Sequence, residues 1–136
     1  MAITFDESLV MGVPQLDREH RELFARLDAL LEAIRRGSSR DEVAHTLAFL
    51  GEYAVKHFAG EEQLMLDVGF PGHAKHRDEH LSFTREFAGL EEEHRRDGAT
   101  TSLVVRVNVW LTGWLRDHIY RTDRELGEFV KARPRP

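Results

Sequence analysis

The sequence contains no cysteine, and this absence removes several kinds of site at once. Disulfides, zinc sites with thiolate ligands, thiolate-held iron–sulfur clusters and cysteine nucleophiles are all excluded. Any metal ion in this protein must therefore be held by nitrogen and oxygen atoms.

An excess of basic residues is also missing. Lys and Arg together number 19 against 24 Asp and Glu, and the formal net charge is −5. Nucleic-acid binding needs Lys and Arg clustered on one face, and the basic tail over 131–136 is too short to provide this. We therefore expect no nucleic-acid partner.

Long hydrophobic runs are absent as well. No stretch approaches the roughly 20 apolar residues of a membrane-spanning helix, and the first seven residues have neither the basic start nor the apolar run of a secretory signal. We expect a cytoplasmic protein without membrane insertion. With 136 residues and 41% hydrophobic content, the chain is long enough for one domain with a sizeable core.

The sequence does contain four amphipathic segments, in which apolar residues recur at steps of three and four. After an irregular arm over 1–16, they predict helices over about 17–36, 40–67, 73–96 and 101–131. Gly37, a capping box from Ser39 to Glu42, the turn over 69–72 and Gly98 separate them. Short connections predict an all-α fold, an antiparallel up-down-up-down four-helix bundle.

Seven possible metal ligands lie in or beside the apolar stripes, where a plain bundle would have Leu or Ile. They are His20, His57, Glu61, His76, His80, His118 and Asp123. In an antiparallel bundle, the early parts of the first and third helices lie at the same end as the late parts of the second and fourth. The seven side chains should therefore meet at one level. Buried polar groups need partners, and a metal pair is the simplest shared partner.

The spacing inside each helix supports this cluster in part. His57 and Glu61 are four residues apart, as are His76 and His80, so each pair shares one helix face. The fifth residue after His118 is Asp123, and in a regular α-helix this spacing corresponds to about 140° around the axis. Either that carboxylate reaches sideways or the helix is locally distorted.

The number of ligands indicates two metal ions. Five imidazoles and two carboxylates exceed what one tetrahedral zinc ion can use. This donor set suits iron, copper, nickel or zinc and disfavours copper(I). If both carboxylates bridge the ions and an oxygen bridge is added, one coordination position stays open for a small ligand such as O2.

Four sequence segments in a fixed order match one known family. They are GVPQLDREH over 12–20, HFAGEEQLM over 57–65, FP followed by HRDEH over 70–80, and WLRDHI followed by Asp123 over 114–123. Together they resemble the hemerythrin family, most of all its single-domain bacterial members, the bacteriohemerythrins. The resemblance runs from the arm to the end of the last helix and implies that 1–136 is a single hemerythrin-like domain.

The resemblance implies a centre of two non-haem iron ions joined by an oxo or hydroxo bridge. Glu61 and Asp123 would bridge the irons. One iron would be completed by three histidines, namely His76, His80 and His118. The other would be completed by His20 and His57, would be five-coordinate and would bind O2 reversibly.

The resemblance also implies an apolar O2 pocket formed by Leu115, Ile119 and Trp114. Such a pocket keeps water and protons away from bound O2. The family usually has a Trp early in the arm, where this chain offers Phe5. That difference touches no ligand, but it could alter how the arm closes the pocket.

We expect a carrier rather than an enzyme, serving oxygen transport, storage or delivery, with NO, azide or other small anions as further ligands. The alternatives are a di-iron redox enzyme, or a protein that senses O2 or NO. Oxygen-activating bundles typically use about four carboxylates and two histidines, whereas five neutral imidazoles favour Fe(II) and O2 release. The sequence identifies no protein partner.

Three further histidines, His45, His73 and His94, lie outside the motif and are predicted as surface or capping residues. Two of them follow a glutamate at the Glu-x-x-His spacing of ferritin-like di-iron bundles, in the pairs Glu42–His45 and Glu91–His94. Such bundles also need an inward Glu from each of the other two helices, and the segment over 91–96 resembles a solvated charge run. We therefore predict no second metal site.

Overall fold

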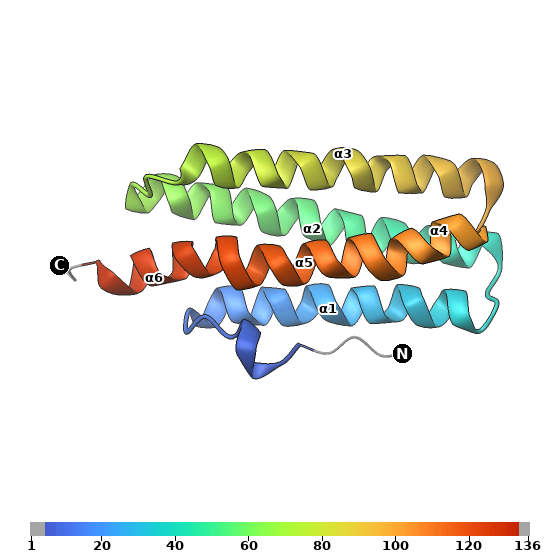
Figure 1. Cartoon of the computed structure of the whole chain (residues 1–136), viewed down its shortest axis with the longest axis horizontal. Coiled ribbons are helices and arrows are strands. Elements are labelled where there is room, and N and C mark those ends of the chain that lie inside the picture. Colours follow the sequence, from blue (N-terminus) through green and yellow to red (C-terminus); the bar gives the residue numbers. More distant parts are fainter. Residues whose placement is uncertain (1–4, 134–136) are drawn as a thin grey trace.

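The computed structural model describes residues 5–133, in which long helices pack side by side in alternating directions (Figure 1). The first three long helices are α1 (Pro14–Arg35), α2 (Arg40–Val68) and α3 (His73–Asp97). The fourth consists of α4 (Thr101–Arg106), η2 (Val107–Leu111), α5 (Thr112–Asp117), η3 (His118–Asp123) and α6 (Arg124–Ala132), which follow one another without a break. The arm carries one short 3₁₀ turn, η1 (Glu7–Leu9). The predicted antiparallel four-helix bundle is confirmed.

The first helix begins at Pro14 and not at the predicted Asp17. Proline is favoured at the first helical position, because that residue has no intrahelical partner for an N–H group. Asp17 instead reaches back over the arm. Its carboxylate accepts hydrogen bonds from the backbone N–H groups of Met11, at 2.8 Å, and Gly12, at 3.1 Å. The arm is thereby fastened to the start of the helix.

The start of α2 agrees with the prediction in one half of the capping box. The Ser39 hydroxyl accepts a hydrogen bond from the backbone N–H of Glu42 at 3.2 Å. The Glu42 carboxylate does not return the bond and lies 3.4 Å from the guanidinium of Arg36. Both side chains of this ion pair are exposed, so it contributes little to stability.

The fourth long helix keeps one face buried by means of two π-helical turns. Its interior residues follow at steps of four, from Leu103 through Val107, Leu111, Leu115 and Ile119 to Asp123. In a regular α-helix each step of four overshoots a turn by about 40°, so five steps would rotate this stripe by about 200°. η2 and η3 each take one extra residue into a turn, which removes about 100°. Two such turns cancel the rotation.

Two apolar clusters lie on either side of the predicted ligand level. The large one fills the bundle and includes Leu27, Leu50, Phe83 and Leu111. The small one closes the end of the bundle and consists of Met11, Leu16, Met65 and Leu126. Its members Leu16 and Met65 lie four residues, or about one turn, beyond His20 and Glu61 on their helices. The ligands are thus enclosed from both directions.

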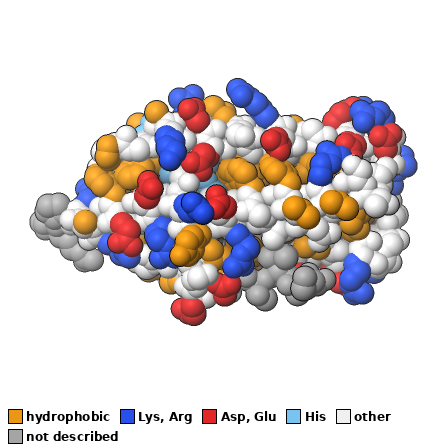
Figure 2. Space-filling model, in the orientation of Figure 1, with side chains coloured by type: hydrophobic (Ala, Val, Ile, Leu, Met, Phe, Trp, Pro, Cys, Tyr) orange, Lys and Arg blue, Asp and Glu red, His pale blue; other side chains and the backbone are white. Residues whose placement is uncertain are grey.

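The surface on the face shown in Figure 2 mixes charged side chains of both signs with hydrophobic ones, and only small areas of histidine are visible. Among residues 5–133, no helix is long and apolar enough to span a membrane.

Candidate metal centre

The structure brings all seven predicted ligands together at one end of the bundle, as their level in the sequence predicts. None of them is more than 3% exposed. Their ligand atoms form two groups, within each of which all atoms lie within 4.8 Å of one another. The first group, called the five-donor group, is Glu61, His76, His80, His118 and Asp123. The second, called the four-donor group, is His20, His57, Glu61 and Asp123.

The two groups share both carboxylates, and Glu61 divides its oxygens between them. Glu61 Oε2 lies 3.2 Å from Nε2 of His57 and 3.5 Å from Nε2 of His20, in the four-donor group. Glu61 Oε1 lies 3.1 Å from Nε2 of His80 and 3.4 Å from Nε2 of His76, in the five-donor group. One carboxylate therefore faces both groups of histidines.

Asp123 is divided in the same way. Its Oδ2 lies 3.0 Å from Nε2 of His20, while its Oδ1 lies 2.9 Å from Nε2 of His76 and 3.1 Å from Nε2 of His118. The π turn η3 makes this possible, because it begins at His118 and ends at Asp123. In a π turn, residue i+5 returns to the neighbourhood of residue i. Of the two alternatives that the sequence left open for Asp123, a sideways-reaching carboxylate and a locally distorted helix, the structure shows the distorted helix.

Most of the inward atoms of the cluster lack hydrogen bonds even though they lie close together; the exceptions are Nε2 of His80 and Nε2 of His118, which lie 3.2 Å apart. Both oxygens of Glu61 and Asp123, and Nε2 of His20 and His76, are buried and have no hydrogen-bond partner among residues 5–133. Each buried polar atom left unpaired costs about 1–3 kcal/mol. Two cations between these atoms would accept their lone pairs at once, so the residues present fit a metal pair.

The imidazoles and carboxylates of the cluster stabilise each other's charged forms, and this shifts their pKa values in opposite directions. Burial alone would lower the pKa of His57, but the carboxylates of Glu61, Glu19 and Asp123 together outweigh it and raise the pKa to about 10. By the same opposition, Asp123 raises the pKa of His118 to about 10 and that of His76 to about 9. Burial would raise the pKa of Glu61, yet the surrounding imidazoles hold it well below its usual value. Metal binding to these rings must therefore displace protons.

Three glutamates hold the outer nitrogens of ligand histidines, and none of the three is among the site residues predicted from the sequence. The Nδ1 atoms of His57, His80 and His118 each lie within hydrogen-bond distance of a carboxylate on the neighbouring helix. The pairs are His57–Glu19 at 2.5 Å, His80–Glu62 at 3.0 Å and His118–Glu79 at 2.8 Å. The outer Nδ1 atoms of His20 and His76 have no such partner. We call Glu19, Glu62 and Glu79 the outer carboxylates.

The residues of the predicted O2 pocket lie beside the centre. Leu115 and Ile119 are buried in the large apolar cluster. Trp114 is half-buried and stacks on the imidazole of His118, with ring centroids 4.4 Å apart and planes 12° apart. Phe58 stacks in a similar way on His80, at 4.0 Å. Aromatic faces therefore cover the five-donor group on its apolar side.

The arm packs against α1 near the first of the predicted ligands. Phe5 packs edge-on against Phe24 at 6.0 Å, and the guanidinium of Arg21 lies 4.9 Å from the Phe5 ring. Phe24 follows His20 by one helical turn. Phe5 therefore packs on α1 about one helical turn from His20.

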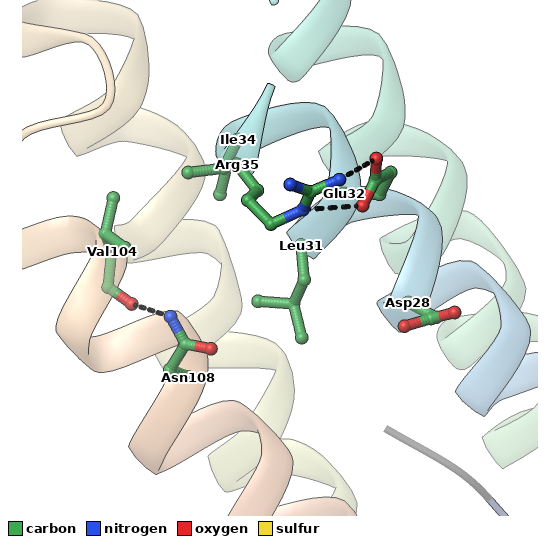
Figure 3. A pocket seen from close by; sticks show the side chains of 7 residues that line it. All are labelled: Asp28, Leu31, Glu32, Ile34, Arg35, Val104 and Asn108. Atoms are coloured by element: carbon green, nitrogen blue, oxygen red, sulfur yellow. Dashed lines mark hydrogen bonds and ion pairs between the residues drawn. The ribbon is translucent and has the colours of Figure 1, made fainter. Parts of the chain in front are cut away.

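A cavity near the other end of α1 does not bring a comparable set of possible metal ligands together (Figure 3). It measures about 450 Å³ and is lined by Asp28, Leu31, Glu32, Ile34, Arg35, Val104 and Asn108. Polar side chains that line it already bond to nearby residues of their own helix: Arg35 pairs with Glu32, and Asn108 donates a hydrogen bond to the carbonyl of Val104 (Figure 3). The seven buried ligands remain the stronger candidate site.

One of the three remaining histidines departs from its prediction. His45 is exposed and His73 is half-buried, but His94 is buried, and its Nε2 atom has no hydrogen-bond partner in the described range 5–133. Burial, together with the positive charge of Arg40, lowers the pKa of His94. It is buried because it continues the interior stripe of α3 after Phe87 and Leu90. Among the described residues, no group of metal ligands forms at that end of the bundle.

The fold and the shared carboxylates define a helical-bundle protein with a cation-binding centre, and comparisons with known proteins agree. The model of the hemerythrin HHE cation binding domain matches residues 11–130. The chain is 28% identical to a bacteriohemerythrin of Stenotrophomonas maltophilia over 130 residues, which is 96% of this chain and 82% of that protein. It is 26% identical to a bacteriohemerythrin of Clostridium acetobutylicum over 121 residues, covering 85% and 91%.

Solved structures show the same fold. A crystal structure of wild-type hemerythrin superimposes with a TM-score of 0.84 at 24% identity, covering 97% of this chain and all of that one. The crystal structure of a hemerythrin mutant superimposes with a TM-score of 0.80 at 26% identity and the same coverage. This chain belongs to the hemerythrin HHE cation-binding domain family.

Proposed function

We propose that this protein binds O2 reversibly at a pair of non-haem iron ions, as a carrier that transports, stores or delivers oxygen. The observation that carries the proposal is the division of seven buried ligands into two groups that share Glu61 and Asp123. Membership of the hemerythrin family supports the choice of iron and O2. The bacteriohemerythrins that resemble this chain support the same function.

Each ligand has a role in this proposal. Glu61 and Asp123 would hold both ions, one oxygen on each, together with an oxo or hydroxo bridge. The positions of their four oxygens support this role. The other ligands divide into His76, His80 and His118 on one ion, and His20 and His57 on the other.

The unequal division gives the small ligand its place. The protein would offer five donors to one ion and only four to the other, which would leave the second ion an open position. An iron pair supplies the reversible exchange of two electrons with O2. The chain supplies enclosure: Leu115 and Ile119 on one side and the small apolar cluster on the other keep bulk water from the centre.

The balance of ligands favours a carrier over an oxidising enzyme. Five of the seven ligands are imidazoles, which are neutral when they bind a metal ion. Carboxylate-rich bundles stabilise oxidised iron through their negative charge, whereas a set rich in imidazole favours Fe(II) and the release of O2. We therefore propose reversible binding as the main activity.

The test is anaerobic loading with Fe(II), followed by cycles of O2 and argon while the visible spectrum is recorded. We expect a charge-transfer band that appears with O2 and disappears under argon over repeated cycles, and that azide suppresses by competing for the open position. Irreversible conversion to a ferric product in the first cycle would refute the carrier. His45→Ala, which removes an exposed histidine, is the matched control and should cycle like the parent protein.

A further inference from the structure

The outer carboxylates are distributed unequally over the two halves of the centre. Glu62 and Glu79 hold His80 and His118, which both belong to the five-donor group. Glu19 alone serves the four-donor group, through His57. Within the part of the chain that the structure describes, the Nδ1 atoms of His20 and His76 have no hydrogen-bond partner, so they do not restore the balance.

The three outer carboxylates occupy equivalent positions in the sequence. Each outer carboxylate is the immediate neighbour of a ligand on its own helix: Glu19 of His20, Glu62 of Glu61, and Glu79 of His80. Adjacent residues point about 100° apart around a helix, so each glutamate points toward the next helix while its neighbour points inward. All three are half-buried, with side chains 25–31% exposed.

Glu79 is held more firmly than a surface glutamate would be. Its Oε1 accepts a hydrogen bond from the Thr122 hydroxyl at 2.7 Å in addition to its contact with His118. Thr122 and His118 both belong to the π turn η3, so one carboxylate spans this turn from α3. Glu79 also lines a cavity of about 620 Å³.

A carboxylate on the outer nitrogen of a metal-bound histidine fixes the orientation of the ring and makes its inner nitrogen a stronger donor. A stronger donor, backed by a negative charge, stabilises an ion of higher charge. The half with two outer carboxylates should therefore hold Fe(III) more strongly than the half with one.

We propose that Glu62 and Glu79 make the five-donor half the side on which Fe(III) persists, while the four-donor half, with Glu19 alone, is reduced first. This inference rests on the proposed di-iron function. The glutamates are positioning residues, because they act through the histidines and do not touch the ions. Reduction of the oxidised pair then proceeds in two one-electron steps, each converting one Fe(III) to Fe(II) with an electron from the electrode.

The test is a mediated spectroelectrochemical titration of the iron-loaded, oxidised protein, after metal analysis has established two irons per chain. The variants are Glu19→Gln, Glu62→Gln and Glu79→Gln, since Gln keeps an oxygen that accepts the Nδ1–H bond and removes only the charge. Glu125→Gln is the control, because Glu125 lines the same cavity as Glu79 without contacting a ligand.

We expect Glu19→Gln to raise the potential of the first step, and Glu62→Gln and Glu79→Gln to raise that of the second. The shift should be roughly tenfold in the equilibrium constant of the step, or about 59 mV. Glu125→Gln should move neither step. A chelator competition with Fe(II) gives a second readout, in which each of the three variants should bind iron about tenfold more weakly.

The possible outcomes distinguish the assignment of the two halves from the proposed di-iron function. A parent protein that does not hold two irons overturns both. Three results from a protein that holds two irons overturn the assignment of the halves and leave the di-iron carrier standing. They are a single unsplit two-electron step, shifts no larger than in Glu125→Gln, and an effect of Glu19→Gln on the second step.

Discussion

His118 and Asp123 are five residues apart in the chain, yet Nε2 of His118 lies 3.1 Å from Oδ1 of Asp123. A regular α-helix would place these residues about 140° apart around its axis. The π turn over His118–Asp123 brings both onto the interior face. π turns are rare and occur frequently at functional sites, and here the turn places the second shared carboxylate.

The π turn predicts at which position after His118 a carboxylate can bind iron. In the double variant Thr122→Asp with Asp123→Ala, the carboxylate follows His118 by four residues, the spacing that suits a regular helix. We expect this variant to hold fewer than two irons per chain, because the fourth residue points toward Glu79 and away from the interior. Metal analysis after desalting measures this. Asp123→Glu is the comparison and should keep more iron; full loading of the double variant would contradict the π geometry.

The shared carboxylates predict unequal effects of single substitutions. Glu61→Ala should abolish binding of both ions, whereas His57→Ala should leave about one iron per chain, since only the four-donor group contains that ring. In the metal-free protein Glu61→Ala also removes the inward carboxylate that faces His57 and His80, so we expect a loss of about 3–5 kcal/mol in the free energy of unfolding, measured with urea. Equal iron loss in the two variants would argue against sharing.

The pKa values predict how the metal-free protein responds to pH. The pKa values of His57 and His118 are raised from 6.5 to about 10, and that of His76 to about 9. Raised values in the folded state stabilise it fully below pH 6.5, and this contribution is lost as pH rises through 9 and 10. The pKa values of Glu61 and Asp123 are lowered, so their contribution is lost only in acid.

We therefore expect the unfolding free energy of the metal-free protein, measured with urea, to fall between pH 6.5 and 10. His118→Gln should reduce this slope, and His45→Gln, at an exposed site, should not. Loading with Fe(II) at pH 7 should release protons, measurable with a pH indicator in weak buffer. A slope that rises over this range would contradict the assigned pKa directions.

The packing of the arm on α1 leads us to predict that Phe5 protects the iron centre from oxidation. Phe5→Ala removes the ring that packs on Phe24 next to the α1 wall of the centre, so we expect faster oxidation of the iron-loaded protein in air, followed by the visible spectrum. Phe5→Trp should oxidise no faster than the parent. Phe49→Ala, which truncates an aromatic side chain on the outer surface, controls for a general loss of stability.

Much of this site could be predicted from the sequence because its ligands lie on regular helical steps. His57 with Glu61 and His76 with His80 are four residues apart, and the four helices run at predictable levels. The π turns could not be derived from steps of three and four. Their signal was the unbroken spacing of four from Leu103 to Asp123, which no regular α-helix can keep on one face.

The outer carboxylates escaped prediction for a different reason. Glu19, Glu62 and Glu79 occupy positions that look like solvated helix surface, and their role depends on which helix lies next to them. Only the packing of neighbouring helices shows that each one faces a ligand histidine. His94 was misjudged for the opposite reason, since its charged neighbours at 92, 93, 95 and 96 suggested exposure while its helical position leads inward.

The most direct test of the metal centre is anomalous X-ray diffraction at the iron edge from crystals of the Fe(II)-loaded protein. Two anomalous peaks should appear inside the bundle, both between Glu61 and Asp123. One should lie within bonding distance of Nε2 of His76, His80 and His118, and the other within bonding distance of Nε2 of His20 and His57 only. A single peak, or two peaks with equal numbers of histidine ligands, would contradict the asymmetric pair.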